Sequence, residues 1–521
     1  MEHVDKRPWA GRLRRLGRPV PLLAAILITM VAAASAGAIV GEGQDAARRL
    51  PRLAAVASPP PPTVPAPSIP VSVALDPTHE GRPIPAAYLG LSFEVTDLRR
   101  IAGYGAHGDL ATLLRSLGPG LLRFGGVSAD TRIAWRDGTT PAPAWTSLAL
   151  EPRDLAALRS LAQRSGWKVL LTVGLAHYEP AAAAREAATA KRLLGPWLAA
   201  IEIGNEPDAY ARHHLRRAPW DFAHYDAEVR AYRSAIARLV PGVPLAGPGV
   251  SGSHVFVKWG PREAAREHPI LLTGHHYPLG CHQQPAPSIE RLLSPATRIA
   301  EGSSLRRYMA VSRASRIPFR MDEANSVSCG GQAGISDTFA STLWATGYIA
   351  QALGAGVSGL NFEGNPANCL GYSPVCAATA ARLTAGALTA QPLWYALLLT
   401  SGLAGDRPLR STLVAPAGTN MAVSALRTPA GGLRFLIVDD EPAGTPAASV
   451  ALPVGSALKA ATVLPLTAPS PEATSGIRLA GADVAPDGSL TRMRPTSLPA
   501  AGGVVTVTVP ASSAALVTAG G

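Results

Sequence analysis

Charge, aromatic residues and cysteine are all scarce in this chain, and each scarcity excludes a class of protein. Charged residues fill only 16% of the 521 positions and apolar residues fill 47%, so most of the chain can bury a core and is not disordered. Only five residues are lysine, and no run of basic residues alternates with aromatic ones in the body of the sequence. A nucleic-acid-binding protein is therefore not expected.

The positive charge that the chain carries is concentrated near its N-terminus. Residues 1–57 contain nine Lys or Arg and four Asp or Glu, and so supply +5 of the formal net charge of +12. Basic residues between positions 6 and 18 precede the uncharged stretch Val20–Val40, a pattern typical of an export signal or a signal-anchor. Ala34-Ser35-Ala36 offers a cleavage site, but the apolar stretch is long enough to span a bilayer, so both alternatives stay open. Residues 1–40 predict a chain that leaves the cytoplasm, either secreted or tethered to the membrane.

Residues 41–70 are a predicted linker, because the run SPPPPTVPAPSIP at 58–70 favours an extended spacer over a helix or a sheet. The spacing of the four cysteines matches no zinc motif, so outside the cytoplasm they are expected to pair as disulfides. These cysteines are Cys281, Cys329, Cys369 and Cys376. Their connectivity stays open, although Cys369 and Cys376 can close a short local loop.

Residues 71–400 alternate short apolar runs with amphipathic stretches, which is typical of parallel βα units. One such stretch, 221–240, repeats apolar residues at helical spacing after a capping residue, Asp221. Eight units of this length predict a (β/α)₈ TIM barrel. The eight strands are expected near Tyr88–Glu94, Leu121–Gly125, Lys168–Gly174, Ala200–Asn205, Pro244–Gly247, Leu271–His276, Phe319–Glu323 and Val357–Phe362.

Beyond residue 400 the apolar period changes to two, most clearly in Val505–Val509, and turn signals such as Pro486-Asp487-Gly488 appear. Residues 401–521 therefore predict a C-terminal antiparallel β-sandwich domain. Apolar residues also alternate just ahead of the barrel, so a first strand at 71–76 can pair into this same domain.

Two glutamates carry the prediction of function. Glu206, in the segment Gly204-Asn205-Glu206-Pro207, follows the fourth predicted strand, and Glu323 ends the seventh. The carboxyl ends of TIM-barrel strands face the active site, and strands four and seven lie across its mouth. Carboxyl groups about 5 Å apart there would predict a retaining glycosidase. Taken alone, Glu206 could equally be a solvated acid in a loop before proline.

The motifs around these glutamates resemble glycoside hydrolase family 79, the heparanase and β-glucuronidase family of clan A. The resemblance is carried by five motifs in order and covers roughly residues 69–521. They are Leu122-Arg123-Phe124-Gly125-Gly126, Gly204-Asn205-Glu206-Pro207, Thr273-Gly274-His275-His276-Tyr277, Glu323-Ala324-Asn325-Ser326 and the run Gly330-Gly331-Gln332-Ala333-Gly334-Ile335-Ser336-Asp337.

The resemblance implies a retaining mechanism without metal or cofactor, in which Glu206 is the acid/base and Glu323 the nucleophile. Asn205 is placed to hydrogen-bond the sugar 2-hydroxyl, and Tyr277 to orient Glu323. Arg123 either hydrogen-bonds Glu323 and keeps it ionised, or is held by structural partners. A metal site at His275 and His276 is not expected, because adjacent strand residues face opposite sides.

The remaining candidates concern sugar recognition. Glu94 and Asp130 end the first two strand motifs and could bind sugar hydroxyls or be surface acids. Gly371 and Tyr372 resemble family positions that hold the carboxylate of a uronate. Glu363 stands where the family leads one to expect histidine, and we expect it at the rim of the site, bound to a sugar hydroxyl.

The sequence thus predicts an extracytoplasmic retaining glycosidase of glucuronate-containing glycans, an exo-β-glucuronidase first of all. Three alternatives stay open: a heparanase-like endo-enzyme, a clan A enzyme for neutral sugars, and a carbohydrate-binding protein without catalysis. The expected partner is a glycan, including an acidic polysaccharide or glycoprotein, since a mildly basic surface attracts acidic chains.

Overall fold

The computed structural model describes residues 68–138, 141–485 and 489–520. The predicted export segment 1–40, nearly all of the linker 41–70 and the turn at 486–488 lie outside the described residues. Within the described part, no helix combines the length and the hydropathy that a membrane crossing requires.

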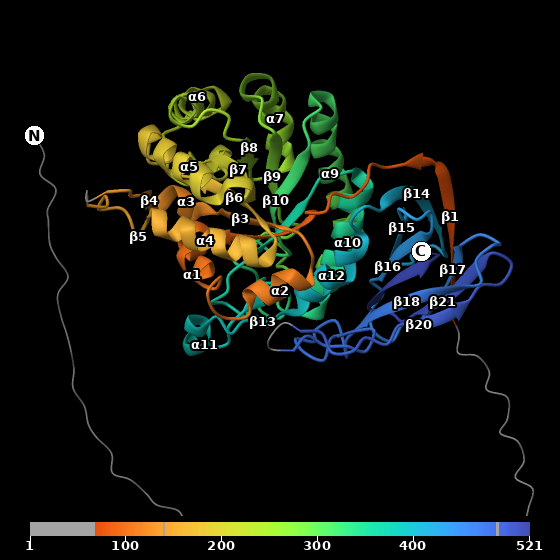
Figure 1. The fold of residues 1–521 in the computed structure, drawn as a ribbon. Coiled ribbons are helices and arrows are strands. Elements are labelled where there is room, and N and C mark those ends of the chain that lie inside the picture. Colours follow the sequence, from red (N-terminus) through yellow and green to blue (C-terminus); the bar gives the residue numbers. More distant parts are fainter. Residues whose placement is uncertain (1–67, 139–140, 486–488, 521) are drawn as a thin grey trace, which may run out of the picture. The chain divides into compact units, whose positions relative to one another are not determined.

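Eight parallel strands close into a barrel (Figure 1). In order around the barrel they are β10 (Phe319–Ala324), β11 (Leu360–Gly364), β2 (Leu89–Glu94), β3 (Leu121–Gly125), β6 (Lys168–Val173), β7 (Leu198–Ile203), β8 (Leu245–Val250) and β9 (Leu271–His276). All eight lie where the sequence predicts a strand. β11 starts three residues late, because Gly356 in the left-handed conformation first ends the preceding helix.

Helices follow the barrel strands and surround them. They are α1 (Leu98–Gly103), α2 (Leu110–Ser116), α3 (Val127–Thr131), α4 (Pro152–Ser165), α5 (Pro180–Leu194), α6 (Phe222–Leu239), α7 (Ser253–Glu267), α8 (Ile289–Leu292), α9 (Pro295–Ser315), α10 (Phe339–Ala355), α11 (Ala380–Ala385) and α12 (Pro392–Thr400). α6 begins where predicted, since the Asp221 carboxylate accepts hydrogen bonds from the backbone N–H groups of Ala223 and His224. Two short strand pairs, β4 (Ile133–Trp135) with β5 (Leu148–Leu150) and β12 (Val375–Cys376) with β13 (Thr389–Ala390), lie in the loops.

The C-terminal domain is one ten-stranded sheet, antiparallel except where β1 pairs with β17. β1 comes from the N-terminal side of the barrel and lies between β14 and β17, as its orange colour among blue strands shows (Figure 1). The strands are β1 (Ile69–Glu80), β14 (Arg407–Val414), β15 (Met421–Arg427), β16 (Leu433–Asp439), β17 (Ala448–Pro453), β18 (Ala460–Thr467), β19 (Arg478–Leu479), β20 (Thr496–Pro499), β21 (Val504–Val509) and β22 (Ser513–Ala519).

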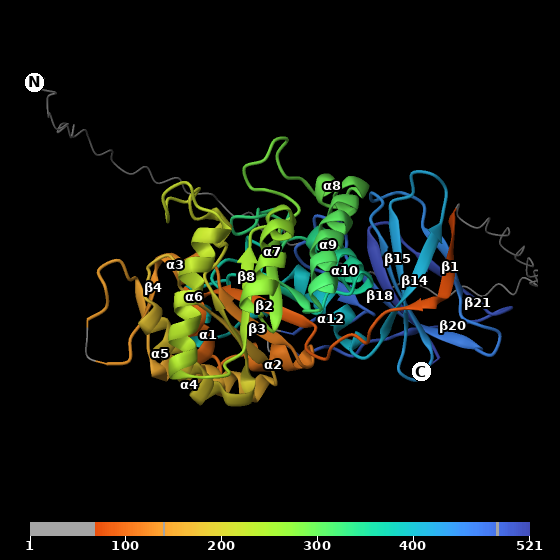
Figure 2. The same ribbon diagram turned by 90° about the horizontal axis from the view of Figure 1, so that it is seen from above.

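Alternate residues of the central strands serve two different cores. On β16, Phe435 and Ile437 belong to the core of the sheet domain, whereas Leu436 and Val438 belong to the barrel core. α10 and α12 lie against this second face (Figure 2). Because both faces are buried, β16 reads as a continuous apolar run rather than an alternating one.

The four cysteines form two disulfides. Cys369–Cys376 closes the short loop expected from the sequence, and Cys281–Cys329 joins the loop after β9 to the loop after β10. Both bonds lie in loops that follow barrel strands at their carboxyl ends, the end that carries the site described next.

Candidate active site

The carboxyl ends of β7, β9 and β10 bring three titratable side chains together. A carboxylate oxygen of Glu206, an imidazole nitrogen of His275 and a carboxylate oxygen of Glu323 all lie within 4.8 Å of one another. The Glu206 side chain is 27% exposed and that of Glu323 10%. The two glutamates that the sequence pairs across 117 residues therefore face each other at the barrel mouth, and Glu206 is the one more open to solvent.

The backbone at Glu206 is held in an unfavourable conformation. Its φ of 45° lies in the left-handed region, which few residues other than glycine adopt. The Glu206 N–H donates to the carbonyl of Gly249 at 2.9 Å, and Pro207 starts a short 3₁₀ turn immediately after it. Strain of this kind is concentrated at functional sites, where the surrounding structure over-determines the conformation.

Two donors fix the carboxylate of Glu323. The Tyr277 hydroxyl donates to Oε1 at 2.9 Å, and the Arg123 guanidinium donates from Nη1 to Oε2 at 2.8 Å. Burial alone would raise the pKa of Glu323, but the charges of His275 and Arg123 together with the Tyr277 hydrogen bond lower it. Glu323 is thus held ionised, as a nucleophile must be.

Arg123 is fully buried and links the carboxylates of the barrel centre. Its Nε lies 2.8 Å from Asp322 Oδ2, and its Nη2 donates to Glu202 at 3.1 Å and to the side-chain oxygen of Asn205 at 2.8 Å. Glu202, whose direction the sequence left open, points into the barrel. Arg123 consequently hydrogen-bonds the proposed nucleophile, Glu323, and is also held by structural partners. Both roles considered from the sequence therefore apply to this residue.

Asn205 is oriented by hydrogen bonds to its side-chain oxygen. That oxygen accepts from Arg123 and from the backbone N–H of Gly126 at 3.1 Å. Gly126 has φ +74°, and a Cβ there would meet the Glu94 carboxylate at 2.4 Å, so glycine is required. No residue that the structure describes accepts from the amide nitrogen of Asn205, which can therefore donate to a ligand.

His275 and His276 face opposite sides of β9, as strand geometry requires. His275 Nδ1 lies 2.9 Å from Glu206 Oε1. Burial would lower the pKa of His275, but the charge of Glu323 and the bond to Glu206 outweigh it and raise the pKa to about 10. His276 instead stacks on Tyr348 outside the barrel.

The three close side chains are a poor metal site. A protonated imidazole has no free lone pair, and Glu323 already accepts from a guanidinium, so a dication would meet two positive charges. A second group, Cys281, His282 and Cys329, has the right atoms near one another, but its cysteines are joined in a disulfide.

Asp322 and Asn325 were not predicted from the sequence. In a regular strand, the side chains of Asp322 and Glu323 would point to opposite faces. The register of β10 against β9 shifts between Met321 and Glu323, however, and the carboxylates of both acids contact Arg123. Burial, followed by the charge of Glu202, raises the pKa of Asp322 to about 7. The Asn325 amide donates to the carbonyls of Glu363 and Tyr372 and so positions the loop after β11. Asn325 belongs to the motif Glu323-Ala324-Asn325-Ser326, and this motif is the sequence feature that could have identified it.

Asp130 requires a correction. It is only 1% exposed, and its oxygens accept from the backbone N–H groups of Leu175, Ala176 and Asn205. A carboxylate used in this way positions Asn205 and does not bind a sugar hydroxyl. Glu94 is different: its Oε2 accepts from the Ser128 N–H at 2.9 Å, burial raises its pKa, and the charge of the nearby Glu323 raises it further.

Glu363 also lies elsewhere than expected. It is 4% exposed and therefore lines the floor of the site rather than the rim, and its Oε2 has no hydrogen-bond partner among the described residues. Burial first, then the charges of Glu323 and Glu94, raises its pKa well above the usual range. The rings of Tyr277 and Tyr372 lie 6.0 Å apart nearby, and the Tyr372 N–H donates to the Gly330 carbonyl.

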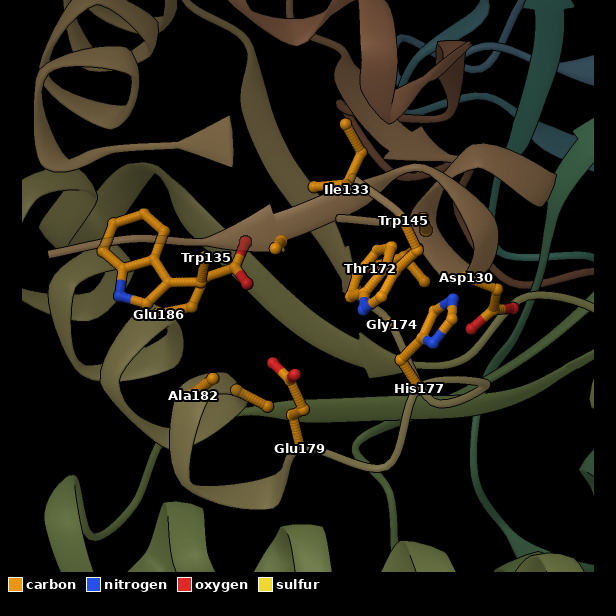
Figure 3. A pocket seen from close by; sticks show the side chains of 13 residues that line it. Asp130, Ile133, Trp135, Trp145, Thr172, Gly174, His177, Glu179, Ala182 and Glu186 are labelled. Carbon is orange, nitrogen blue, oxygen red and sulfur yellow. The ribbon is translucent and has the colours of Figure 1, made fainter. Parts of the chain in front are cut away.

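A separate hollow of about 30 Å³ lies on the other side of Asp130 (Figure 3). The rings of Trp145 and His177 stack at 3.7 Å beside it, and Glu179 and Glu186 line it. Its volume suits one or two water molecules rather than a sugar. This hollow contains neither Glu206 nor Glu323.

Known proteins resemble this chain in both domains. Residues 418–516 match the family model described as Glycosyl hydrolase family 79 C-terminal beta domain. No curated protein sequence matches the chain. The resemblance to family 79 predicted from the sequence is therefore confirmed for the C-terminal domain.

Solved structures match the described fold over most of the chain. A 4-O-α-L-rhamnosyl-β-D-glucuronidase from Fusarium oxysporum is 20% identical, with a TM-score of 0.69 over 86% of this chain and 100% of its own. A GH51 arabinofuranosidase from Xanthomonas axonopodis pv. citri is 14% identical, with a TM-score of 0.64 over 87% and 100%. The catalytic domain of a GH30 xylanase from Talaromyces cellulolyticus is 12% identical, with a TM-score of 0.54 over 86% and 100%. These likenesses confirm the predicted fold, a TIM barrel followed by a β-sandwich domain.

Proposed function

Because its C-terminal domain matches that of glycoside hydrolase family 79, we propose that this protein is a retaining β-glycosidase. Glu323 is the nucleophile and Glu206 the acid/base. The observation that carries this proposal is the separation of the two carboxylates: oxygens within 4.8 Å leave no room for the water molecule that an inverting enzyme places between carboxylate and sugar.

In the first step a Glu323 oxygen attacks the anomeric carbon of the sugar while the bond to the leaving oxygen breaks. That oxygen takes a proton from Glu206 and departs as a hydroxyl group. The contact between His275 Nδ1 and Glu206 Oε1 orients this carboxyl group, and Asn205 donates to the sugar 2-hydroxyl. A glycosyl-enzyme ester on Glu323 results.

In the second step water attacks the same carbon, and Glu206 accepts the proton of that water. The ester bond breaks, and Glu323 leaves as a carboxylate that Arg123 and Tyr277 again hold ionised. Two displacements return the anomeric carbon to its original configuration.

We propose glucuronate as the sugar, cleaved from the end of a glycan. The fungal relative in the comparison is a rhamnosyl-glucuronidase, and Tyr372, which resembles a family position that holds a uronate carboxylate, lies near Glu323 and Glu94. A neutral sugar is the second candidate. An ionised Glu363 would repel a uronate, but burial raises the pKa of Glu363 and favours its neutral form, which a uronate tolerates. Two disulfides favour a site of action outside the cytoplasm, secreted or held by the N-terminal segment.

The test is a panel of aryl β-glycosides, with the first-formed product anomer followed by NMR. We expect turnover of the glucuronide and a β-anomer. Turnover of the glucoside or the arabinoside instead of the glucuronide would show that the site binds a neutral sugar. An α-anomer would exclude retention, and no turnover of any glycoside would leave the endo-enzyme and the carbohydrate-binding protein as alternatives.

A further inference from the structure

Glu206 lies just beyond the part of β7 that the barrel sheet supports. β7 ends at Ile203, and its pairing with β8 ends earlier still, where Glu202 pairs with Ala246. The carboxyl group of Glu206 therefore takes its position from the loop that carries it. In that loop the φ of 45° at Glu206 is one that a glutamate keeps only when the surrounding structure holds it there.

Two contacts tie this loop to the end of β8. The first is the hydrogen bond from the Glu206 N–H to the Gly249 carbonyl, at 2.9 Å. The second joins Asp208 to Ser251: the carboxylate accepts from the Ser251 N–H at 2.9 Å and from the Ser251 hydroxyl at 2.6 Å. Each partner in the second contact lies two positions after its counterpart in the first. The side chain of Asp208 thus continues the connection between the two loops past the end of the strand pairing.

Asp208 lies close to the acid/base without a hydrogen bond to it among the described residues. Burial raises the pKa of Asp208, the two hydrogen bonds from Ser251 lower it, and the charge of Glu206 raises it. Only Pro207 separates the two acids, and its ring fixes φ, so the link between them is stiff. Asp208 can therefore act on Glu206 through the loop that they share.

The acid/base depends on this loop because little else holds its carboxyl group. Among the described residues, the one side chain in hydrogen-bond contact with that group is His275. Without the contact between Asp208 and Ser251, the conformation of Glu206 depends on its bond to Gly249, and the loop can relax toward a right-handed conformation. A general acid must lie within hydrogen-bond reach of the leaving oxygen, and a displacement of about 1 Å can cost about a hundredfold in rate.

We propose that Asp208 is a positioning residue for the acid/base: its two hydrogen bonds with Ser251 hold the loop that aims Glu206 at the leaving oxygen. The proposal rests on the function proposed above and extends it, since it adds a residue that acts through Glu206. It concerns proton transfer to the leaving group and from water, and not the attack by Glu323.

The experiment uses the full chain and two aryl glycosides of the sugar that the wild type cleaves, one with a poor leaving group, phenyl, and one with a good one, dinitrophenyl. A good leaving group departs with little help from an acid. Asp208→Ala should therefore lower kcat/KM for the phenyl glycoside by about tenfold more than for the dinitrophenyl glycoside. Ser251→Ala keeps the backbone donor and should show the same selectivity to a smaller extent.

Two further readouts separate positioning from a general loss of structure. Azide attacks the glycosyl-enzyme without a base, so it should restore kcat of Asp208→Ala on the dinitrophenyl glycoside. Asp208→Asn should stay within about threefold of the wild type, because an amide can accept from the Ser251 N–H and donate to its hydroxyl. Asp76→Ala is the matched control: Asp76, on β1 of the C-terminal sheet, accepts from the N–H and the hydroxyl of Thr78 and should leave both glycosides unaffected.

An equal loss for both leaving groups in Asp208→Ala and Ser251→Ala would overturn the proposal, and so would a loss in Asp208→Asn as large as that in Asp208→Ala. If Asp208→Ala does not fold, the selectivity of Ser251→Ala decides. Failure of the wild type to cleave any aryl glycoside would contradict the proposed function, and this proposal with it.

Discussion

At the scale of single residues, the site contains more carboxyl groups than cations. Six acids lie around one guanidinium and one imidazole: Glu94, Glu202, Glu206, Asp322, Glu323 and Glu363. They cannot all be ionised without strong repulsion. The contacts assign the charges: Glu323 accepts from Arg123 and Tyr277, whereas Glu363 has no cation bonded to it and keeps its proton.

Replacing Arg123 tests its role toward the nucleophile. Arg123→Met should lower kcat/KM for the aryl glucuronide by about a hundredfold or more, and should cost about 3–5 kcal/mol of stability because buried carboxylates lose their partner. Since Arg123 lowers the pKa of Glu323, its loss should move the acid limb of the pH profile to higher pH. The pH dependence of kcat/KM measures this. A folded variant with the acid limb in its original place would show that Arg123 does not control Glu323.

Glu363 predicts a pH effect of the opposite sense. Burial, together with the charges of Glu323 and Glu94, raises its pKa, so the neutral acid persists to higher pH than that of an exposed glutamic acid. Once that proton is lost, the new charge faces Glu323, Glu94 and the uronate, and glucuronide turnover should fall. Glu363→Gln has no proton to lose there, and its basic limb should lie at higher pH than that of the wild type. Identical basic limbs in the two proteins would mean that Glu363 is already ionised or does not face the sugar.

At the scale of elements, periodicity predicted the strands, but not the way in which neighbouring strands are aligned. β3 and β9 have the predicted bounds, and each begins with two leucines that follow a proline-containing turn. Asp322 was missed because the register shift in β10 is a property of the strand pair. Asp130 was misassigned for a related reason: the backbone groups that it binds belong to β6 and β7 loops far away in the sequence.

α5 carries a buried acid, Glu186, whose side chain lines the small hollow of Figure 3. Burial raises its pKa from 4.5 to about 8. The folded state therefore binds this proton more tightly than the unfolded state does. The resulting stability is complete below about pH 4.5 and is lost as the pH rises through 8.

Glu186→Gln should accordingly gain stability over the wild type by about 1.4 kcal/mol for each pH unit between roughly 5 and 8. Denaturant unfolding at several pH values measures the difference. Glu472→Gln, an exposed acid, is the control. Parallel stability curves for Glu186→Gln and wild type would contradict a buried, protonated Glu186.

At the scale of the whole molecule, the barrel and one face of the C-terminal sheet contribute to the same hydrophobic core. Leu436 and Val438 of β16 belong to the barrel core, and the Arg298 guanidinium of α9 binds Asp440 next to the same strand. β1 comes before the barrel in sequence but pairs within the C-terminal sheet. The sequence indicated this pairing only through an alternation of four apolar residues, since nothing local specifies which strands it joins.

The central claim is that Glu323 forms a covalent bond to the sugar, and trapping that bond tests it most directly. A 2-fluoro-glucuronosyl fluoride reacts in the first step but slows the second, so the glycosyl-enzyme accumulates. Mass spectrometry of the peptides should find one added 2-fluoro-glucuronosyl group, on Glu323. A label on Asp322, Glu363 or Glu206, or turnover of this reagent with no labelled peptide, would contradict the account.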